Sequence, residues 1–69
     1  MLLVSRLVQA RKRAGVSQKT VAEALNISQQ QYCRYENGKN EIPVRYIIGL
    51  CKFYKISADW LLGLKDEGE

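Results

Sequence analysis

Apolar residues recur every three to four positions along most of this chain, the spacing that places them on one face of an α-helix. The first such stripe consists of Leu3, Leu7, Ala10 and Ala14. Three basic residues, Arg6, Lys12 and Arg13, fall outside it and are predicted to lie on the surface. Because glycine readily takes the left-handed conformation that closes a helix, the first helix is predicted to end at Gly15.

Three times in the chain, an apolar residue directly precedes a serine and a second apolar residue follows that serine by four positions. The three sets are Val16-Ser17 with Val21, Ile27-Ser28 with Tyr32, and Ile56-Ser57 with Leu61. The serine can accept a hydrogen bond from a free N–H group of a helix's first turn, while the apolar pair closes over the helix start as a hydrophobic staple. Each set therefore predicts the start of a helix.

The starts at Ser17 and Ser28 lie only eleven residues apart. The spacing predicts a helix over 17–25, a tight turn, and a further helix over 28–37. The turn needs a positive φ at Asn26, which asparagine tolerates better than most residues, though less well than glycine. A short helix, a tight turn and a second helix form a helix-turn-helix, which places its second helix in the DNA major groove.

The two helices of this motif differ in what they present to solvent. The inward positions are Val21, Ala22 and Leu25 on the first, and Tyr32 and Tyr35 on the second. The outward positions of the second helix are Gln29, Gln30, Cys33 and Arg34, and Gly38 ends that helix. The outward face is therefore polar and carries hydrogen-bonding side chains.

A fourth helix is predicted to begin with Pro43 at its first position, where the missing N–H is no disadvantage. Its apolar stripe consists of Val44, Ile47, Ile48 and Cys51, widened by Leu50 and Tyr54. A short last helix contains Asp59 and Trp60. The pattern predicts one all-α domain of five short helices over residues 1–69, with its core at about 3–64 and a charged tail, 65–69, that frays.

Composition excludes several classes of protein. With 69 residues, the chain is close to the lower limit for a stable core, so association with a second copy would help. No apolar run reaches the roughly 20 residues that span a bilayer, and the N-terminal residues do not form a secretion signal, so we expect a cytoplasmic protein. Cys33 and Cys51 are then expected as reduced thiols. Without histidine, the chain offers no usual zinc site and no Ser/His or Cys/His pair, so we expect no enzyme, metal, cofactor or small-molecule ligand.

Positive charge is concentrated in one half of the chain. Residues 1–39 hold seven basic and two acidic residues, a net charge of +5, whereas residues 40–69 hold four basic and five acidic residues, a net charge of −1. This distribution is expected if the half with the helix-turn-helix faces phosphates. A solvated basic face on an ordinary small domain is the alternative.

Six short motifs occur in order along the chain. They are Gly15-Val16-Ser17-Gln18, Val21-Ala22, Asn26-Ile27-Ser28, Tyr35-Glu36-Asn37-Gly38-Lys39, Glu41-Ile42-Pro43 and Asp59-Trp60-Leu61-Leu62-Gly63. Together they make the chain, from Arg6 to Gly63, resemble the DNA-binding domain of the lambdoid phage Cro and CI repressors, the large bacterial family called XRE-like. The resemblance implies a compact lambda-repressor-like fold that binds double-stranded DNA.

The resemblance also implies roles for individual residues. Gln18 matches a glutamine that holds a phosphate and braces the first base-reading residue; the alternative is a solvated helix start. Gln29 and Gln30 match positions that touch base edges, and their amides suit adenine, unless they are simply exposed helix formers. Arg34 is the candidate for reading guanine, with a phosphate contact as its main competitor.

Further matched positions are backbone contacts. Ser28 can cap its helix and donate its hydroxyl to a phosphate. Asn37, Gly38 and Lys39 match a loop whose backbone amides and ammonium group would hold the sugar-phosphate chain without reading sequence.

Two other matches are expected to be structural. Arg11 and Glu36 match an ion pair between the first and third helices, although Arg11 could lean toward a phosphate. Gln31 stands three residues after Ser28 and is expected to complete a capping box rather than to touch a base.

The chain departs from the family pattern in three places. Asn26 replaces the commoner glycine, a small strain. Cys33 lies on the third helix in a slot usually filled by a polar residue. Val44 and Arg45 fall where relatives often place a phosphate contact, and the sequence does not say which of them would face DNA.

These matches predict a sequence-specific transcriptional regulator, a repressor that binds a palindromic operator as a homodimer. Trp60, Leu62 and Leu64 are candidates for the dimer surface, with Trp60 as a core residue the alternative. One rival function is an antitoxin or adaptor that keeps the fold but binds a protein. A second is a redox sensor in which oxidation of Cys33 breaks DNA contact.

Overall fold

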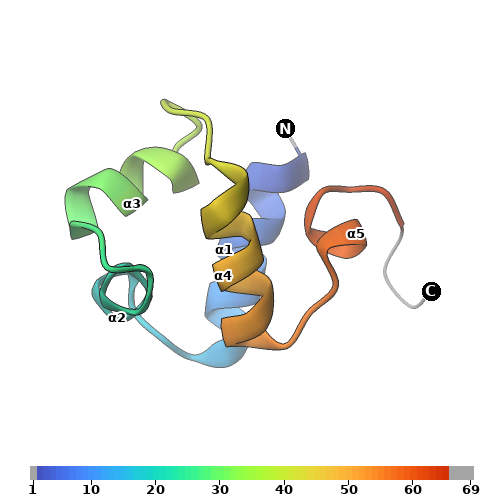
Figure 1. The fold of residues 1–69 in the computed structure, drawn as a ribbon, viewed down its shortest axis with the longest axis horizontal. Helices are drawn as coiled ribbons and strands as arrows, with labels where there is room; N and C mark the ends of the chain where they lie inside the picture. The colour runs from blue at the N-terminus through green and yellow to red at the C-terminus, as the bar shows by residue number, and fades with distance from the viewer. Residues whose placement is uncertain (1, 66–69) are drawn as a thin grey trace.

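The computed structural model describes residues 2–65 of the chain. Within this range five helices follow one another with no strand: α1 (Leu2–Ala14), α2 (Gln18–Leu25), α3 (Gln29–Glu36), α4 (Val44–Tyr54) and α5 (Ala58–Leu61). Figure 1 shows α1 and α4 at the centre, with α2 and α3 on one side and α5 on the other. The predicted all-α, five-helix fold with a helix-turn-helix at α2 and α3 is confirmed. Of the tail predicted to fray, 65–69, only Lys65 is described, and its carbonyl accepts a hydrogen bond from Arg6; 66–69 lie outside the described residues.

Serine caps start three of these helices, as predicted. Ser17, Ser28 and Ser57 each accept a hydrogen bond from the backbone N–H three residues later, at 3.0 or 3.1 Å. Each serine precedes its helix by one residue, because a capping residue keeps an extended backbone while its side chain bonds the first turn. Such a cap stabilises a helix by about 1 kcal/mol.

The ends of α2 and α4 both use a left-handed residue that is not glycine. Asn26 has φ +60°, as predicted, and Lys55 has φ +59°, which the sequence did not indicate. The prediction for Pro43 was wrong by one position. Pro43 precedes α4 with an extended ψ of 151°, and its carbonyl accepts a hydrogen bond from Ile47 N–H at 3.2 Å.

The hydrophobic core of the described residues draws on all five helices, two residues from each, and on the loop before α4. It consists of Leu7, Ala10, Val21, Ala22, Tyr32, Tyr35, Ile42, Ile47, Leu50, Trp60 and Leu61. Close approach of α4 to α2 depends on Gly49, where a Cβ atom would lie 3.0 Å from Cδ2 of Leu25. None of these helices is long and apolar enough to cross a bilayer.

The predicted inward stripes of α1 and α4 were partly wrong. Val44 is 69% exposed and Ile48 is 50% exposed, because the buried face of α4 is centred on Ile47 and Leu50 and turns these two side chains toward its flank. Ala14, the last residue of α1, is also exposed. The helical period was correct, but the sequence stripe was wider than the buried face.

Arg6 is the clearest correction to the sequence prediction, because it is buried and not on the surface. It is only 7% exposed. Its guanidinium donates hydrogen bonds to the carbonyl of Trp60 and, at 2.8 Å, to the carbonyl of Lys65. The guanidinium also lies over the Trp60 ring, 4.9 Å from its centroid. Carbonyl acceptors and an aromatic face make burial of this cation possible.

Candidate nucleic-acid interface

The polar residues of α3 and of the loop after it form a shallow hollow of about 520 Å³ on one face of the molecule. Six of the seven predicted contact residues line this hollow: Gln18, Gln29, Gln30, Arg34, Asn37 and Lys39. Cys33, which the sequence placed on the same helix, lines it as well. The fold therefore brings the start of α2, the length of α3 and the following loop to one surface.

A second hollow, of about 450 Å³, lies on the other side of the exposed face of α3. Ser28, the seventh predicted residue, lines it together with Asn40 and Glu41. Gln30 and Arg34 line both hollows. These two exposed side chains, one helical turn apart, therefore form a ridge between the hollows.

The first hollow is positively charged. Arg34 and Lys39 line it and are exposed, and no carboxylate belongs to the residues that line it. The first residues of α2 and α3, Gln18 and Gln29, lie in the same hollow, so each of these helix N-termini adds a partial positive charge. The arrangement suits a polyanion that follows the surface.

The backbone donors of the loop after α3 are used within the chain. The backbone N–H groups of 37–40 all donate to carbonyls of α3, for example from Lys39 to Arg34 at 2.9 Å and from Gly38 to Tyr35 at 3.2 Å. These backbone amides, predicted to hold the sugar-phosphate chain, are thus already engaged by the last carbonyls of the helix in the chain without DNA, and their contact with DNA stays a prediction. The side chains of Asn37 and Lys39 are the groups that this loop presents to the hollow.

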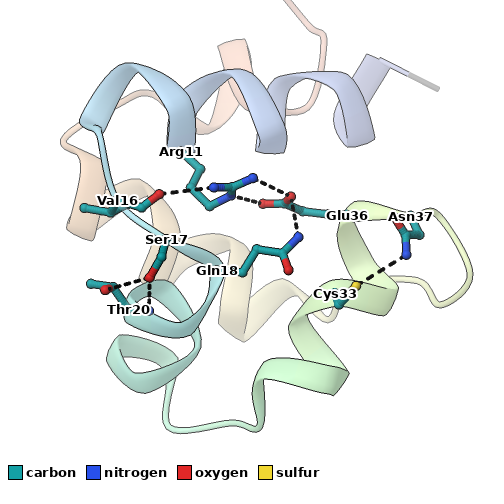
Figure 2. A network of polar contacts seen from close by, with 8 residues as sticks. All are labelled: Arg11, Val16, Ser17, Gln18, Thr20, Cys33, Glu36 and Asn37. Atoms are coloured by element: carbon teal, nitrogen blue, oxygen red, sulfur yellow. Dashed lines mark hydrogen bonds and ion pairs between the residues drawn. The ribbon is translucent and has the colours of Figure 1, made fainter.

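The ion pair between α1 and α3 is confirmed. Figure 2 shows the Arg11 guanidinium against the Glu36 carboxylate, with Nε 2.8 Å from Oε2 and Nη2 3.3 Å from Oε1. Glu36 also accepts a hydrogen bond of 3.0 Å from Nε2 of Gln18. Burial acts to raise the pKa of Glu36, but the hydrogen bonds from Arg11 and Gln18 outweigh it and leave that pKa lowered.

Two tyrosine side chains complete the surroundings of this ion pair. The hydroxyls of Tyr32 and Tyr54 are buried without a hydrogen-bond partner among the described residues. Burial raises the pKa of both, that of Tyr54 to about 12, so both stay protonated at neutral pH. The sequence predicted Tyr32 and Tyr54 only as apolar core residues.

Gln31 corrects a further prediction. Its backbone N–H donates to Oγ of Ser28 at 3.0 Å, but its side-chain amide donates to the hydroxyl of Tyr35 at 2.8 Å. The predicted capping box is therefore only half formed. The side chain finds a neighbour one turn ahead on its own helix instead of reaching back.

Cys33 and Asn37 are linked within α3 and its end. Nδ2 of Asn37 donates to Sγ of Cys33 at 3.4 Å (Figure 2). Cys33 is half-buried and lines the same hollow as the outward residues of α3. Both cysteines are free thiols.

A helix-turn-helix family matches residues 7–61, which include all of this surface. The chain belongs to the XRE-type helix-turn-helix family. The sequence did not predict the contact between Gln18 and Glu36 in this DNA-binding domain. The two residues are 18 positions apart and meet only in the fold.

Several curated bacterial proteins are similar to this XRE-type domain. The HTH-type transcriptional regulator ImmR of Bacillus subtilis (strain 168) is 40% identical over 67 residues, which are 97% of this chain and 52% of the relative. The SPbeta prophage-derived uncharacterized HTH-type transcriptional regulator YonR of the same organism is 37% identical over 57 residues, 83% of this chain and 53% of the relative. The chain spans about half the length of these relatives.

The fold also has a solved counterpart. The crystal structure of a transcriptional regulator from Listeria innocua matches with a TM-score of 0.83, covering 97% of this chain and 63% of that one. At 24% identity, this likeness shows that the two chains share the XRE-type fold.

Proposed function

We propose that this chain is the DNA-binding part of a sequence-specific transcriptional regulator, a repressor acting on double-stranded DNA in the cytoplasm. The observation that carries the proposal is the clustering of Gln18, Gln29, Gln30, Arg34, Asn37 and Lys39 around one basic hollow on the exposed face of the helix-turn-helix. The names of the similar proteins, which call them transcriptional regulators, support the same conclusion.

The ridge on α3 is the part that would read base sequence. Gln30 and Arg34 stand on it, and Gln29 flanks it at the start of the helix. A glutamine amide pairs with adenine N6 and N7, and an arginine pairs with guanine O6 and N7. We assign phosphate contacts, which carry no sequence information, to Gln18, Ser28, Asn37 and Lys39.

A symmetric dimer would give this small surface its specificity, because one such helix reads only a few base pairs and two copies about 34 Å apart read a palindrome. Exposed apolar side chains provide a surface for association. Val44 and Leu62 border a groove of about 560 Å³ that also includes Asn37 and Asn40, next to the proposed DNA contacts. Trp60, one predicted candidate, is only 8% exposed and belongs to the core instead.

A salt titration tests the proposal against the adaptor alternative. Binding of the chain to a mixed-sequence 20-base-pair duplex is measured between about 50 and 200 mM salt. Each phosphate neutralised by a lysine or arginine adds about −0.9 to the slope of log affinity against log salt. We expect a fall of at least about tenfold over this range. A flat response, or no binding at 50 mM salt, would favour a protein-binding module on the same fold.

A further inference from the structure

One side chain of the proposed DNA interface is held from behind by a buried carboxylate. Gln18, the first residue of α2, lines the basic hollow, and its Nε2 donates to Oε1 of Glu36 at 3.0 Å. Glu36 is 6% exposed and lies at the end of α3, beneath that surface. Figure 2 shows the Gln18 amide directed toward this carboxylate.

The carboxylate itself is fixed. Arg11 of α1 donates to both of its oxygens, and the same guanidinium donates to the carbonyl of Val16 at 3.1 Å, in the loop just before α2. The buried Glu36 carboxylate therefore joins α1, α2 and α3, and protein side chains hold it in place. An arginine that donates through two nitrogens restricts a carboxylate more than a single contact does.

An ionised carboxylate accepts hydrogen bonds and does not donate them. If the Gln18 amide rotated by 180°, its Oε1 would face the oxygens of Glu36, and two acceptors would be in contact. Glu36 therefore selects one of the two orientations of this amide. In that orientation one N–H of Nε2 is used by Glu36, while the second N–H and Oε1 remain available at the hollow.

We propose that Glu36 is a positioning residue of the DNA interface, which orients the Gln18 amide so that a donor is ready for a phosphate and an acceptor for a neighbouring side chain. The proposal rests on the proposed function for its consequence in DNA binding, but the orientation itself exists without DNA. It extends the role of Glu36 beyond its ion pair with Arg11, because the carboxylate also determines what α2 offers to a ligand.

The orientation can be measured on the unmodified chain by NMR. The side-chain amide protons of Gln18 are compared with those of Gln29 and Gln30, which are exposed and serve as internal references. We expect a Gln18 proton to exchange with solvent at least about tenfold more slowly, because Glu36 accepts it. Exchange at the same rate as in the two references would overturn the proposal, and this result does not require any variant to fold.

The effect on DNA binding is tested with a double-mutant cycle on a duplex recovered from a random pool. Gln18→Ala is expected to weaken binding about tenfold, the value of one hydrogen bond to a phosphate. Glu36→Gln replaces one acceptor oxygen with a donor and should weaken binding to a similar degree. Gln18→Ala combined with Glu36→Gln should bind no more weakly than Gln18→Ala, because both changes remove the same contact.

A control separates positioning from loss of stability. Ile47→Val removes one buried methyl group from the core, at a residue that does not line the hollow, and its effect should multiply with that of Gln18→Ala. If Glu36→Gln also multiplies with Gln18→Ala, after correction for the folded fraction, Glu36 is only structural and the proposal fails. If the unmodified chain binds no duplex, the proposed function fails, whereas the NMR experiment still decides the orientation of Gln18.

Discussion

Arg6 on α1 lies over the ring of Trp60 on α5 and donates a hydrogen bond to the backbone carbonyl of the same tryptophan. The two residues are 54 positions apart, and their contact attaches the last helix to the first. A short helix such as α5 (Ala58–Leu61) is not stable alone, so its place in the fold depends on contacts of this kind.

Replacing Arg6 should therefore destabilise the domain. Arg6→Met keeps an unbranched side chain of similar length but removes the donors to Trp60 and Lys65, and we expect a loss of about 1.5 to 3 kcal/mol in the free energy of unfolding. Arg13→Met is the matched control. Arg13 also lies near the Trp60 ring, at 5.5 Å, but it is exposed, so its loss should amount to less than about 1 kcal/mol. Urea denaturation followed by circular dichroism measures both, and equal losses would contradict this reading of Arg6.

The stability of the domain should fall in acid because of Glu36. Its pKa is lower in the folded chain than in the unfolded one, so its contribution is fully present above the usual pKa of about 4.3. As the pH decreases below that value, the unfolded chain takes up the proton first, and the contribution is lost as the pH passes the folded-state pKa. Urea midpoints between pH 7 and pH 3 measure this decrease.

Glu36→Gln should flatten this acid dependence and lower stability at pH 7 by about 3 kcal/mol or more, because it removes the charge that pairs with Arg11 and one of the two side-chain oxygens that accept from it. Glu23→Gln changes an exposed glutamate and should leave the acid dependence as it is. An unchanged acid dependence in Glu36→Gln would show that other groups cause it.

The left-handed residue after α4 offers a stabilising substitution. Lys55 has φ +59°, a conformation that costs an ordinary residue about 1 to 2 kcal/mol. Glycine avoids this cost in the folded chain, but its greater flexibility in the unfolded chain offsets part of the gain. We expect Lys55→Gly to stabilise the domain by about 0.5 to 1 kcal/mol. Asn26→Gly, at φ +60°, should gain less, because asparagine tolerates this conformation. Thermal unfolding of both variants tests the order, which would be contradicted by a larger gain at Asn26.

Two side chains of the proposed interface should act differently on DNA. Arg34→Ala should relax the preference at one base position at a cost of about 1 to 3 kcal/mol, because the residue stands on the ridge of α3. Lys39→Ala should weaken all duplexes alike and reduce the salt slope by about 1. Affinities for a set of duplexes with single base changes separate the two effects. If both variants gave the same uniform loss, the division between reading and phosphate contact would be incorrect.

Local signals in the sequence were enough for the helices and most of their ends. A serine cap with its apolar staple involves neighbours within five residues, so Ser17, Ser28 and Ser57 could be identified without the fold. Asn26 was recognisable because asparagine favours a positive φ. Lys55 has the same conformation, but lysine has no such preference, so its positive φ could not be predicted from the sequence.

What the sequence could not supply were contacts between distant residues. Burial of Arg6 depends on carbonyls at the far end of the chain, and the Gln18 hydrogen bond depends on where α3 ends relative to α2. The spacing of polar residues along the chain does not distinguish a buried arginine such as Arg6, or a hydrogen-bonded glutamine such as Gln18, from one exposed to solvent. The contact residues were predicted from the resemblance to a family. They lie on one surface because the chain has the fold of that family.

Selection of bound duplexes from a random pool tests the central claim most directly. The unmodified chain is mixed with duplexes that contain a randomised segment of about 30 base pairs, and bound molecules are recovered and sequenced over several rounds. We predict enrichment of one sequence that is repeated in inverted orientation, with half-site centres one helical turn apart. Recovery of an unenriched pool would contradict sequence-specific recognition by α3, and enrichment of a single unrepeated site would contradict the symmetric dimer.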